Sequence, residues 1–230
     1  MRQSRPPKLF GAIQMKTNKE EDIISFLHEK YPDAKTSLRF SSPFECLVAI
    51  SLSAQSTDKA VNEVTPPLFE KYPTSKEMSK ANISDVENII HSLGLYRNKA
   101  KNIISLSYSL EEKYGGRVPF KREELITLPG VGNKTACVFL LEMNEGNYFP
   151  VDTHVSRISL RLGYSNKNDE PLSIQRKLEK KFPEEEWNFL HHAFIYFGRD
   201  ICKAQKPSCE KCMLGKYCSY LKKHSSTAAK

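Results

Sequence analysis

A turn marked by two glycines, directly before an apolar stretch, is the feature that most constrains how this chain can fold. Residues 128–136 read LPGVGNKTA, so Gly130 and Gly132 flank a single valine. Glycine accepts left-handed backbone conformations and lets the main chain approach a ligand closely. A G-x-G turn alone is more often purely conformational, but here Leu128 and Val131 can pack inward while the glycine amides face outward. We therefore expect a helix-hairpin-helix unit.

The helix expected after this turn predicts an anion site. The first turn of a helix has unpaired N–H groups, and a nucleic-acid phosphate is a natural ligand for them. Lys134 and Thr135 would stand beside that phosphate. The chain has 35 Lys and Arg residues against 27 Asp and Glu residues, a net charge of +8. This charge fits a polyanionic partner, although many basic proteins bind none.

Lys134 and Asp152 form a candidate catalytic pair. Most lysines in the first turn of a helix are solvated, but the helix dipole and partial burial in a cleft would favour a neutral amine, which can attack a sugar C1′. Asp152 precedes a helix expected at residues 153–162, where an aspartate is also a good N-cap. Its carboxylate could orient the amine, accept a proton or stabilise positive charge on the sugar, and the two roles can coexist. His154 could line the same pocket or be purely structural.

The rest of the chain has the pattern of helices, and no strand pattern is evident. Ser42, Pro43 and Glu45 mark one helix start, and Thr17 with Glu20 marks another. Glycines and prolines separate the further helices, which we expect near residues 57–70, 84–92, 97–113, 121–127, 133–143, 153–162, 172–181 and 185–199. The expected fold class is therefore all-α.

Four of the six cysteines lie close together near the C-terminal end and indicate a metal site. They are Cys202, Cys209, Cys212 and Cys218, with the spacing C-x6-C-x2-C-x5-C. Structural zinc usually takes two C-x2-C pairs, and only one such pair is present, whereas an iron–sulfur cluster accepts four thiolates with uneven spacing. Spacing alone leaves zinc and [4Fe–4S] equally plausible, and it makes disulfides the least favoured alternative.

The apolar patterning argues against a membrane protein. No apolar run approaches the roughly 18 residues that a membrane-spanning helix needs, and residues 1–17 contain no hydrophobic signal core. We expect a soluble, intracellular protein, either cytoplasmic or associated with the nucleoid.

Taken together, these motifs resemble the endonuclease III family of DNA glycosylases. The hairpin at 128–136 and the segment VDTHV at 151–155 carry the resemblance, and SAQSTD at 53–58 and GLYRNKA at 94–100 extend it. The similarity covers residues 18–221, most of the chain. One position departs from the pattern: asparagine stands at position 133, where many relatives carry arginine, so one possible phosphate contact is absent.

The resemblance implies an activity, a partner and a cofactor. It implies that Lys134 is a Schiff-base nucleophile assisted by Asp152, that oxidised pyrimidines are removed, and that β-elimination then cleaves the strand 3′ to the lesion. Gln55 and Leu95 would fill the gap left by an extruded base. The cysteine loop would hold a structural [4Fe–4S] cluster, and the partner would be double-stranded DNA containing damaged bases or abasic sites.

The resemblance also implies two helical lobes with DNA across the groove between them. Residues 36–147 would form a central domain closed by the hairpin, and residues 18–35 together with 148–221 would form a cluster domain. Residues 1–17 would be a flexible extension and residues 222–230 a disordered tail. We expect the protein to be a monomer.

Two alternative functions stay open. One is a mismatch-specific glycosylase of the same superfamily; Lys134 argues against its purely monofunctional members, which the resemblance implies lack this lysine. The other is a non-enzymatic DNA-binding module with a structural metal. Such a module would account for the charge, the hairpin and the cysteines, but it would need neither Lys134 nor Asp152.

Overall fold

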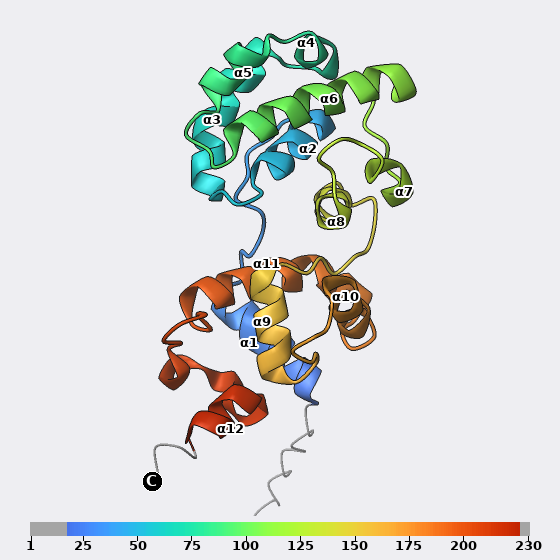
Figure 1. The fold of residues 1–230 in the computed structure, drawn as a ribbon. Coiled ribbons are helices and arrows are strands. Elements are labelled where there is room, and N and C mark those ends of the chain that lie inside the picture. Colours follow the sequence, from blue (N-terminus) through green and yellow to red (C-terminus); the bar gives the residue numbers. More distant parts are fainter. Residues whose placement is uncertain (1–17, 226–230) are drawn as a thin grey trace, which may run out of the picture.

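The computed structural model describes residues 18–225, and within that range the chain is helical and forms no strand. The helices gather into two lobes, one above the other in Figure 1. The described part of the chain begins in the lower lobe with α1 (Lys19–Lys30), crosses to the upper lobe, and returns after α8 (Asn133–Glu142). The upper lobe is therefore one continuous segment inserted into the lower lobe. The all-α fold class is confirmed.

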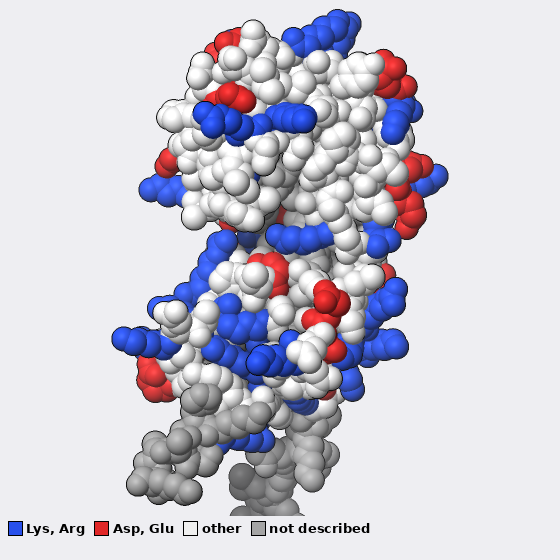
Figure 2. Space-filling model, viewed as in Figure 1, with Lys and Arg blue, Asp and Glu red and all other residues white. Residues whose placement is uncertain are grey.

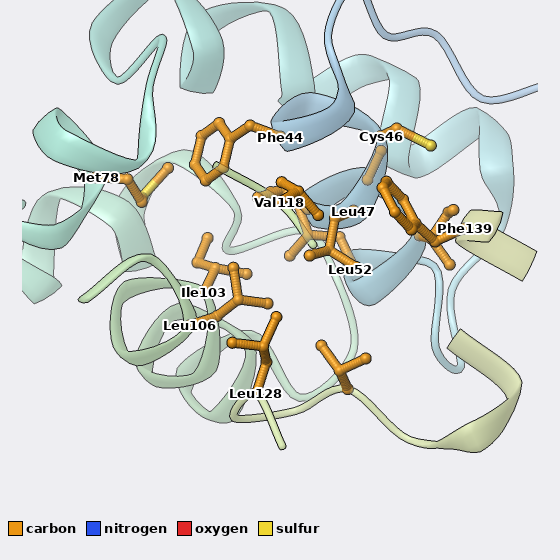
Figure 3. Packing of buried hydrophobic residues seen from close by; sticks show 14 of the residues in the cluster. Phe44, Cys46, Leu47, Leu52, Met78, Ile103, Leu106, Val118, Leu128 and Phe139 are labelled. Carbon is orange, nitrogen blue, oxygen red and sulfur yellow. The ribbon is translucent and has the colours of Figure 1, made fainter. Parts of the chain in front are cut away.

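The helices of the upper lobe enclose the first of two hydrophobic cores. Besides α8 they are α2 (Pro43–Leu52), α3 (Asp58–Lys71), α4 (Ser75–Ser79), α5 (Ile83–Ile89), α6 (Tyr96–Tyr114) and α7 (Arg122–Leu125). Figure 3 shows side chains of several helices meeting in this core, among them Leu47, Ile103, Leu106 and Phe139. All four are at most 1% exposed, and burying a side chain of this size contributes about 1.5–3 kcal/mol. This core gives α8 and the hairpin a rigid support.

The lower lobe is built from both ends of the described chain. With α1 it contains α9 (Thr153–Leu162), α10 (Pro171–Glu179), α11 (Trp187–Asp200), α12 (Ser219–Ser225) and the short 3₁₀ helices η1 (Glu184–Glu186), η2 (Cys209–Lys211) and η3 (Met213–Tyr217). Its core includes Ile23 of α1, Ile158 of α9 and Phe194 of α11, none of which is exposed. The early helix α1 thus packs against elements that follow it by more than a hundred residues.

Local capping signals place one of the two predicted helix starts correctly. The hydroxyl of Ser42 accepts a hydrogen bond from the Glu45 amide at 3.2 Å, as expected for the N-cap of α2. The start expected at Thr17 is wrong by one residue, because Asn18 is the N-cap of α1. Its side chain accepts from the Glu21 amide at 2.8 Å, and the Glu21 carboxylate accepts from the Asn18 amide at 3.1 Å. The pattern of a polar cap and a later glutamate occurs in two overlapping registers here.

Two further helices were not expected from the sequence. The five residues of α4 are too few to show a helical period. The predicted start of the disordered tail, residue 222, is too early, because α12 continues to Ser225. This helix packs beside α9, where the Ser219 hydroxyl donates to the carbonyl of Arg161 at 3.0 Å. Residues 226–230 and the extension at 1–17 lie outside the described residues.

Of the helices between residues 18 and 225, none combines the length and the apolar character needed to cross a bilayer.

Candidate active site

A cleft of about 510 Å³ lies between the two lobes, and we call it the interlobe cleft. The upper lobe contributes Gln55, Lys134 and Thr135 to its walls, and the lower lobe contributes Asp152 and His154. These five residues are brought together from segments almost a hundred positions apart. The remaining three predicted DNA-binding residues, Leu95, Gly130 and Gly132, do not line the cleft.

The hairpin that leads into α8 has the predicted inward packing. Leu128 and Val131 are 2% and 5% exposed. Gly130 has a φ of +76°, and a Cβ added to it would lie 2.9 Å from the Cβ of Asn102, so a larger residue would be strained there. Gly132 differs from expectation, because its φ of −86° is open to any residue. A Cβ on Gly132 would meet no atom within 4 Å, so open space lies beside this residue.

Lys134 is the second residue of α8 and faces the interlobe cleft. Gly132 caps this helix without a side-chain hydrogen bond, which leaves the first N–H groups of the helix for an external acceptor. Lys134 is exposed to solvent rather than partly buried as expected.

Asp152 is the N-cap of α9, as one of its two predicted roles requires. Its Oδ1 accepts a hydrogen bond from the Val155 amide at 2.8 Å. The residue also lines the interlobe cleft, so its second carboxylate oxygen can serve another partner. The cap orients the carboxylate without consuming it.

His154 is half-buried in the cleft wall and lies beside Arg157. One guanidinium nitrogen of Arg157 is 3.1 Å from His154 Nδ1 and also donates to the carbonyl of Gly198 at 3.0 Å. Burial, together with the positive charges of Arg157 and Arg199 and against the attraction of Asp152, lowers the pKa of His154. His154 is therefore a neutral ring at neutral pH.

The floor of the interlobe cleft contains buried groups that sequence reasoning did not assign to the site. His191 Nδ1 donates to the carbonyl of Pro150 at 2.9 Å, and complete burial lowers its pKa well below the usual range. His192 Nε2 lies 2.9 Å from Oε1 of Glu142, the last residue of α8, and neither of these buried atoms has a hydrogen-bond partner among the described residues. The sequence carries no signal that pairs His192 with Glu142.

Gln55 and Leu95 share an unusual backbone conformation. Their φ angles are +54° and +59°, in the left-handed region that side chains other than glycine rarely adopt. Gln55 lies at the cleft, whereas the Leu95 side chain is 58% exposed. A Cβ added to Gly94 would be 3.5 Å from the carbonyl oxygen of Gln55, so the two loops lie close together.

The four clustered cysteines line one small cavity in the lower lobe, together with Arg161. None of them forms a disulfide. Arg161 donates to the Cys202 sulfur at 3.2 Å, and the amide of Leu221 approaches the Cys218 sulfur at 3.4 Å. In residues 18–225 no group of three or more His, Cys, Asp or Glu side chains has the arrangement of a preformed metal site. The predicted ligand set stays a prediction.

Positive charge gathers beside the interlobe cleft. Figure 2 shows Lys and Arg side chains at the waist between the lobes and over the lower lobe, while the same face of the upper lobe is mostly uncharged. A polyanion laid across the waist would meet this charge.

Comparison with known proteins gives a consistent result. The model of HhH-GPD superfamily base excision DNA repair proteins matches residues 48–184. Endonuclease III of Bacillus subtilis (strain 168) is 46% identical over 198 residues, which cover 86% of this chain and 90% of that relative. Endonuclease III of Escherichia coli (strain K12) is 40% identical over 210 residues, 91% of this chain and 99% of the relative. A trapped endonuclease III–DNA covalent intermediate, in an estranged-adenine complex, aligns with a TM-score of 0.85 at 44% identity, covering 91% of this chain and 99% of that one.

Proposed function

Because this chain belongs to the endonuclease III family of base excision DNA repair enzymes, we propose that the interlobe cleft is the active site of a bifunctional DNA glycosylase and AP lyase acting on oxidised pyrimidines in double-stranded DNA. The observation that carries this proposal is that Lys134 and Asp152, from different lobes, line the same cleft. One supplies an amine and the other a carboxylate, the two groups that Schiff-base chemistry at a sugar needs.

Lys134 is the nucleophile in this proposal. Its amine attacks C1′ of the extruded nucleotide, a C–N bond forms, and the glycosidic bond breaks with its electron pair leaving on the base. The C1′–O4′ bond then breaks as O4′ takes up the proton that the amine released, which gives a protonated Schiff base between Lys134 and C1′. Transfer of a C2′ proton to water then expels the 3′ oxygen with its phosphate, which cleaves the strand by β-elimination. Water hydrolyses the remaining imine and regenerates the lysine.

Asp152 and His154 assist this sequence from the lower lobe. The carboxylate of Asp152 stabilises the positive charge that develops on the sugar as the base leaves, and it can accept the proton that the attacking amine releases. His154 is neutral because burial and two arginines lower its pKa. It contacts the extruded nucleotide through hydrogen bonding rather than through charge.

The DNA lies across the interlobe cleft, with the hairpin against the DNA backbone. The open space beside Gly132 and the uncapped N–H groups of α8 suit a phosphate, and Gly130 and Thr135 belong to the same contact. Gln55 and Leu95 enter the duplex where the damaged base leaves it. Extrusion is necessary because C1′ is out of reach while the base is stacked.

The four cysteines are the proposed ligands of a [4Fe–4S] cluster. The donor set fits, because four thiols free of disulfides line one cavity and the sulfurs of Cys202 and Cys218 have N–H donors beside them. Bound iron would supply structural cross-linking of the loop, and the chemistry at C1′ needs only Lys134 and Asp152.

Family membership argues against a purely DNA-binding module with a structural metal, since the relatives are enzymes by name. A mismatch-specific glycosylase of the same superfamily is the second candidate function, and Lys134 disfavours its monofunctional form, because hydrolytic base removal needs no amine.

Borohydride trapping tests the proposal directly. Incubation with duplex DNA that contains an oxidised pyrimidine or an abasic site is expected to give a covalent adduct, because borohydride reduces the Schiff base. Lys134→Gln should abolish the adduct. Lys35→Gln is the matched control, since Lys35 is the second lysine lining the cleft, and it should retain trapping.

Other outcomes assign the chain differently. DNA binding without any adduct would leave a binding module, and base release without strand cleavage would indicate a monofunctional glycosylase. An adduct that survives in Lys134→Gln but disappears in Lys35→Gln would move the nucleophile to the other lysine.

A further inference from the structure

Lys99 is a buried lysine that the proposed chemistry does not use. It lies in the first turn of α6 and is 7% exposed, and burial lowers its pKa. Its Nζ donates to the Ser56 hydroxyl at 2.7 Å. Among residues 18–225 no carboxylate lies within ion-pair distance of it. Burying an ammonium with only neutral partners is unfavourable, so the fold retains Lys99 at a cost to stability.

The position of Lys99 connects the two loops that are proposed to enter DNA. Ser56 directly follows Gln55, and the Lys99 amide donates to the carbonyl of Leu95 at 3.0 Å. The side chain of Lys99 therefore runs from the backbone beside Leu95 to the residue that follows Gln55. The two loops also lie close together, since a Cβ added to Gly94 would lie 3.5 Å from the Gln55 carbonyl oxygen.

Both loops have a backbone that needs external support. Four described residues other than glycine have a positive φ, and two of them are Gln55 and Leu95. Side chains in this region are strained, and such residues persist only where their surroundings hold them. Leu95 cannot be held by its own side chain, which is 58% exposed. Lys99, whose amide donates to the Leu95 carbonyl and whose ammonium donates to Ser56, is placed to give this support.

We propose that Lys99 is a positioning residue whose buried ammonium holds the loops of Gln55 and Leu95 together as one rigid wedge before DNA is bound. This inference rests on the proposed function, because it assumes that the two residues enter the duplex. A preformed wedge avoids the entropic cost of ordering two loops at the moment when the base is extruded. Lys99 thereby acts on extrusion and not on the bonds that Lys134 makes and breaks.

The test compares strand cleavage at an abasic site in duplex DNA and in single-stranded DNA. Lys99→Met keeps the length of the side chain and removes the ammonium, and Ser56→Ala removes only the acceptor. Both should slow duplex cleavage by roughly tenfold, the effect of one lost charged hydrogen bond, with less than about a twofold change on single strands, where no gap needs filling. Lys113→Met, exposed at the other end of α6, is the matched control and should change neither rate.

An equal loss on both substrates would reduce Lys99 to general support of the fold and overturn the inference, as would an unchanged duplex rate. If Lys99→Met does not fold, Ser56→Ala decides alone. Gln55→Ala and Leu95→Ala are measured in parallel. If Gln55→Ala and Leu95→Ala show no loss that is selective for duplex DNA, the proposed entry of the loops into the duplex is wrong. If these two variants show such a loss but Lys99→Met and Ser56→Ala do not, only the proposed role of Lys99 is wrong.

Discussion

Asp152 has two roles that a single pair of substitutions can separate. Its carboxylate caps α9 through the Val155 amide and also lines the interlobe cleft. Asparagine caps a helix as well as aspartate does, but it cannot accept a proton or stabilise a cation. We therefore expect Asp152→Asn to keep the melting temperature while single-turnover base release falls about 100-fold or more.

Asp152→Ala is the comparison for this prediction. It removes the cap as well as the carboxylate, so about 1 kcal/mol of stability should be lost in addition to the activity. Thermal unfolding and single-turnover kinetics on both variants provide the check. Full activity in Asp152→Asn would limit Asp152 to capping.

The residues that the sequence could predict differ from those it could not in the contacts that fix their conformation. The capping roles of Ser42 and Asp152 depend on groups three residues away in the chain, so the local pattern was sufficient. The left-handed backbone at Gln55 and Leu95 depends on contacts between distant loops, which no local pattern encodes. The burial of Lys99 has the same origin. The resemblance to a known family pointed to Gln55 and Leu95, but it gave no physical reason for their backbone geometry.

At the scale of elements, the hairpin before α8 contains two glycines with opposite requirements. Gly130 has a positive φ and a crowded Cβ position, whereas Gly132 has an ordinary φ and open space around it. Gly130→Ala should therefore lower the free energy of unfolding by about 2 kcal/mol, because an alanine in the left-handed region is strained and would clash with Asn102. Gly132→Ala should cost at most about 1 kcal/mol, as a weaker N-cap.

DNA binding should separate the same two variants. In Gly132→Ala the added methyl group occupies the space that a phosphate would take beside the N-terminus of α8, so affinity for an abasic-site duplex should fall while the fold is kept. Urea unfolding and equilibrium binding at fixed salt measure the two effects. Normal binding by Gly132→Ala would mean that no phosphate approaches this turn.

At the scale of the whole molecule, the sequence predicted the helices, and the resemblance predicted a groove. The sequence could not predict how side chains pack where the two lobes meet, which we call the seam. The floor of the interlobe cleft depends on pairs such as Glu142 with His192, and the Asn188 side chain donates to the carbonyl of Leu141 at 3.2 Å across the same seam. Each pair joins α8 to α11, and the relative rotation of these helices decides which side chains meet. Periodicity gives the buried face of a helix and not its partner.

The two separate cores predict how the molecule responds to loss of the proposed cluster. The cysteine loop is joined to the lower lobe, where Tyr217 donates to the Asp22 carboxylate at 2.6 Å and Arg161 donates to the Lys203 carbonyl at 2.8 Å. No cysteine of the loop belongs to the upper core. If the loop holds a [4Fe–4S] cluster, the purified protein should be brown and Cys212→Ser should be colourless. Because metal binding and folding are coupled, amide exchange in this variant should accelerate in α1, α9 and α12.

Exchange in α2 and α6 should stay slow in the same variant, since these helices pack in the upper core. Cys137→Ala is the matched control, because Cys137 is a buried cysteine of α8 that lies outside the loop, and it should stay brown. A colourless wild-type protein with stoichiometric zinc would overturn the iron assignment. If amide exchange accelerates equally in both lobes, the cluster stabilises the molecule as one cooperative unit. The upper lobe could then not hold the hairpin and Lys134 in place after iron is lost.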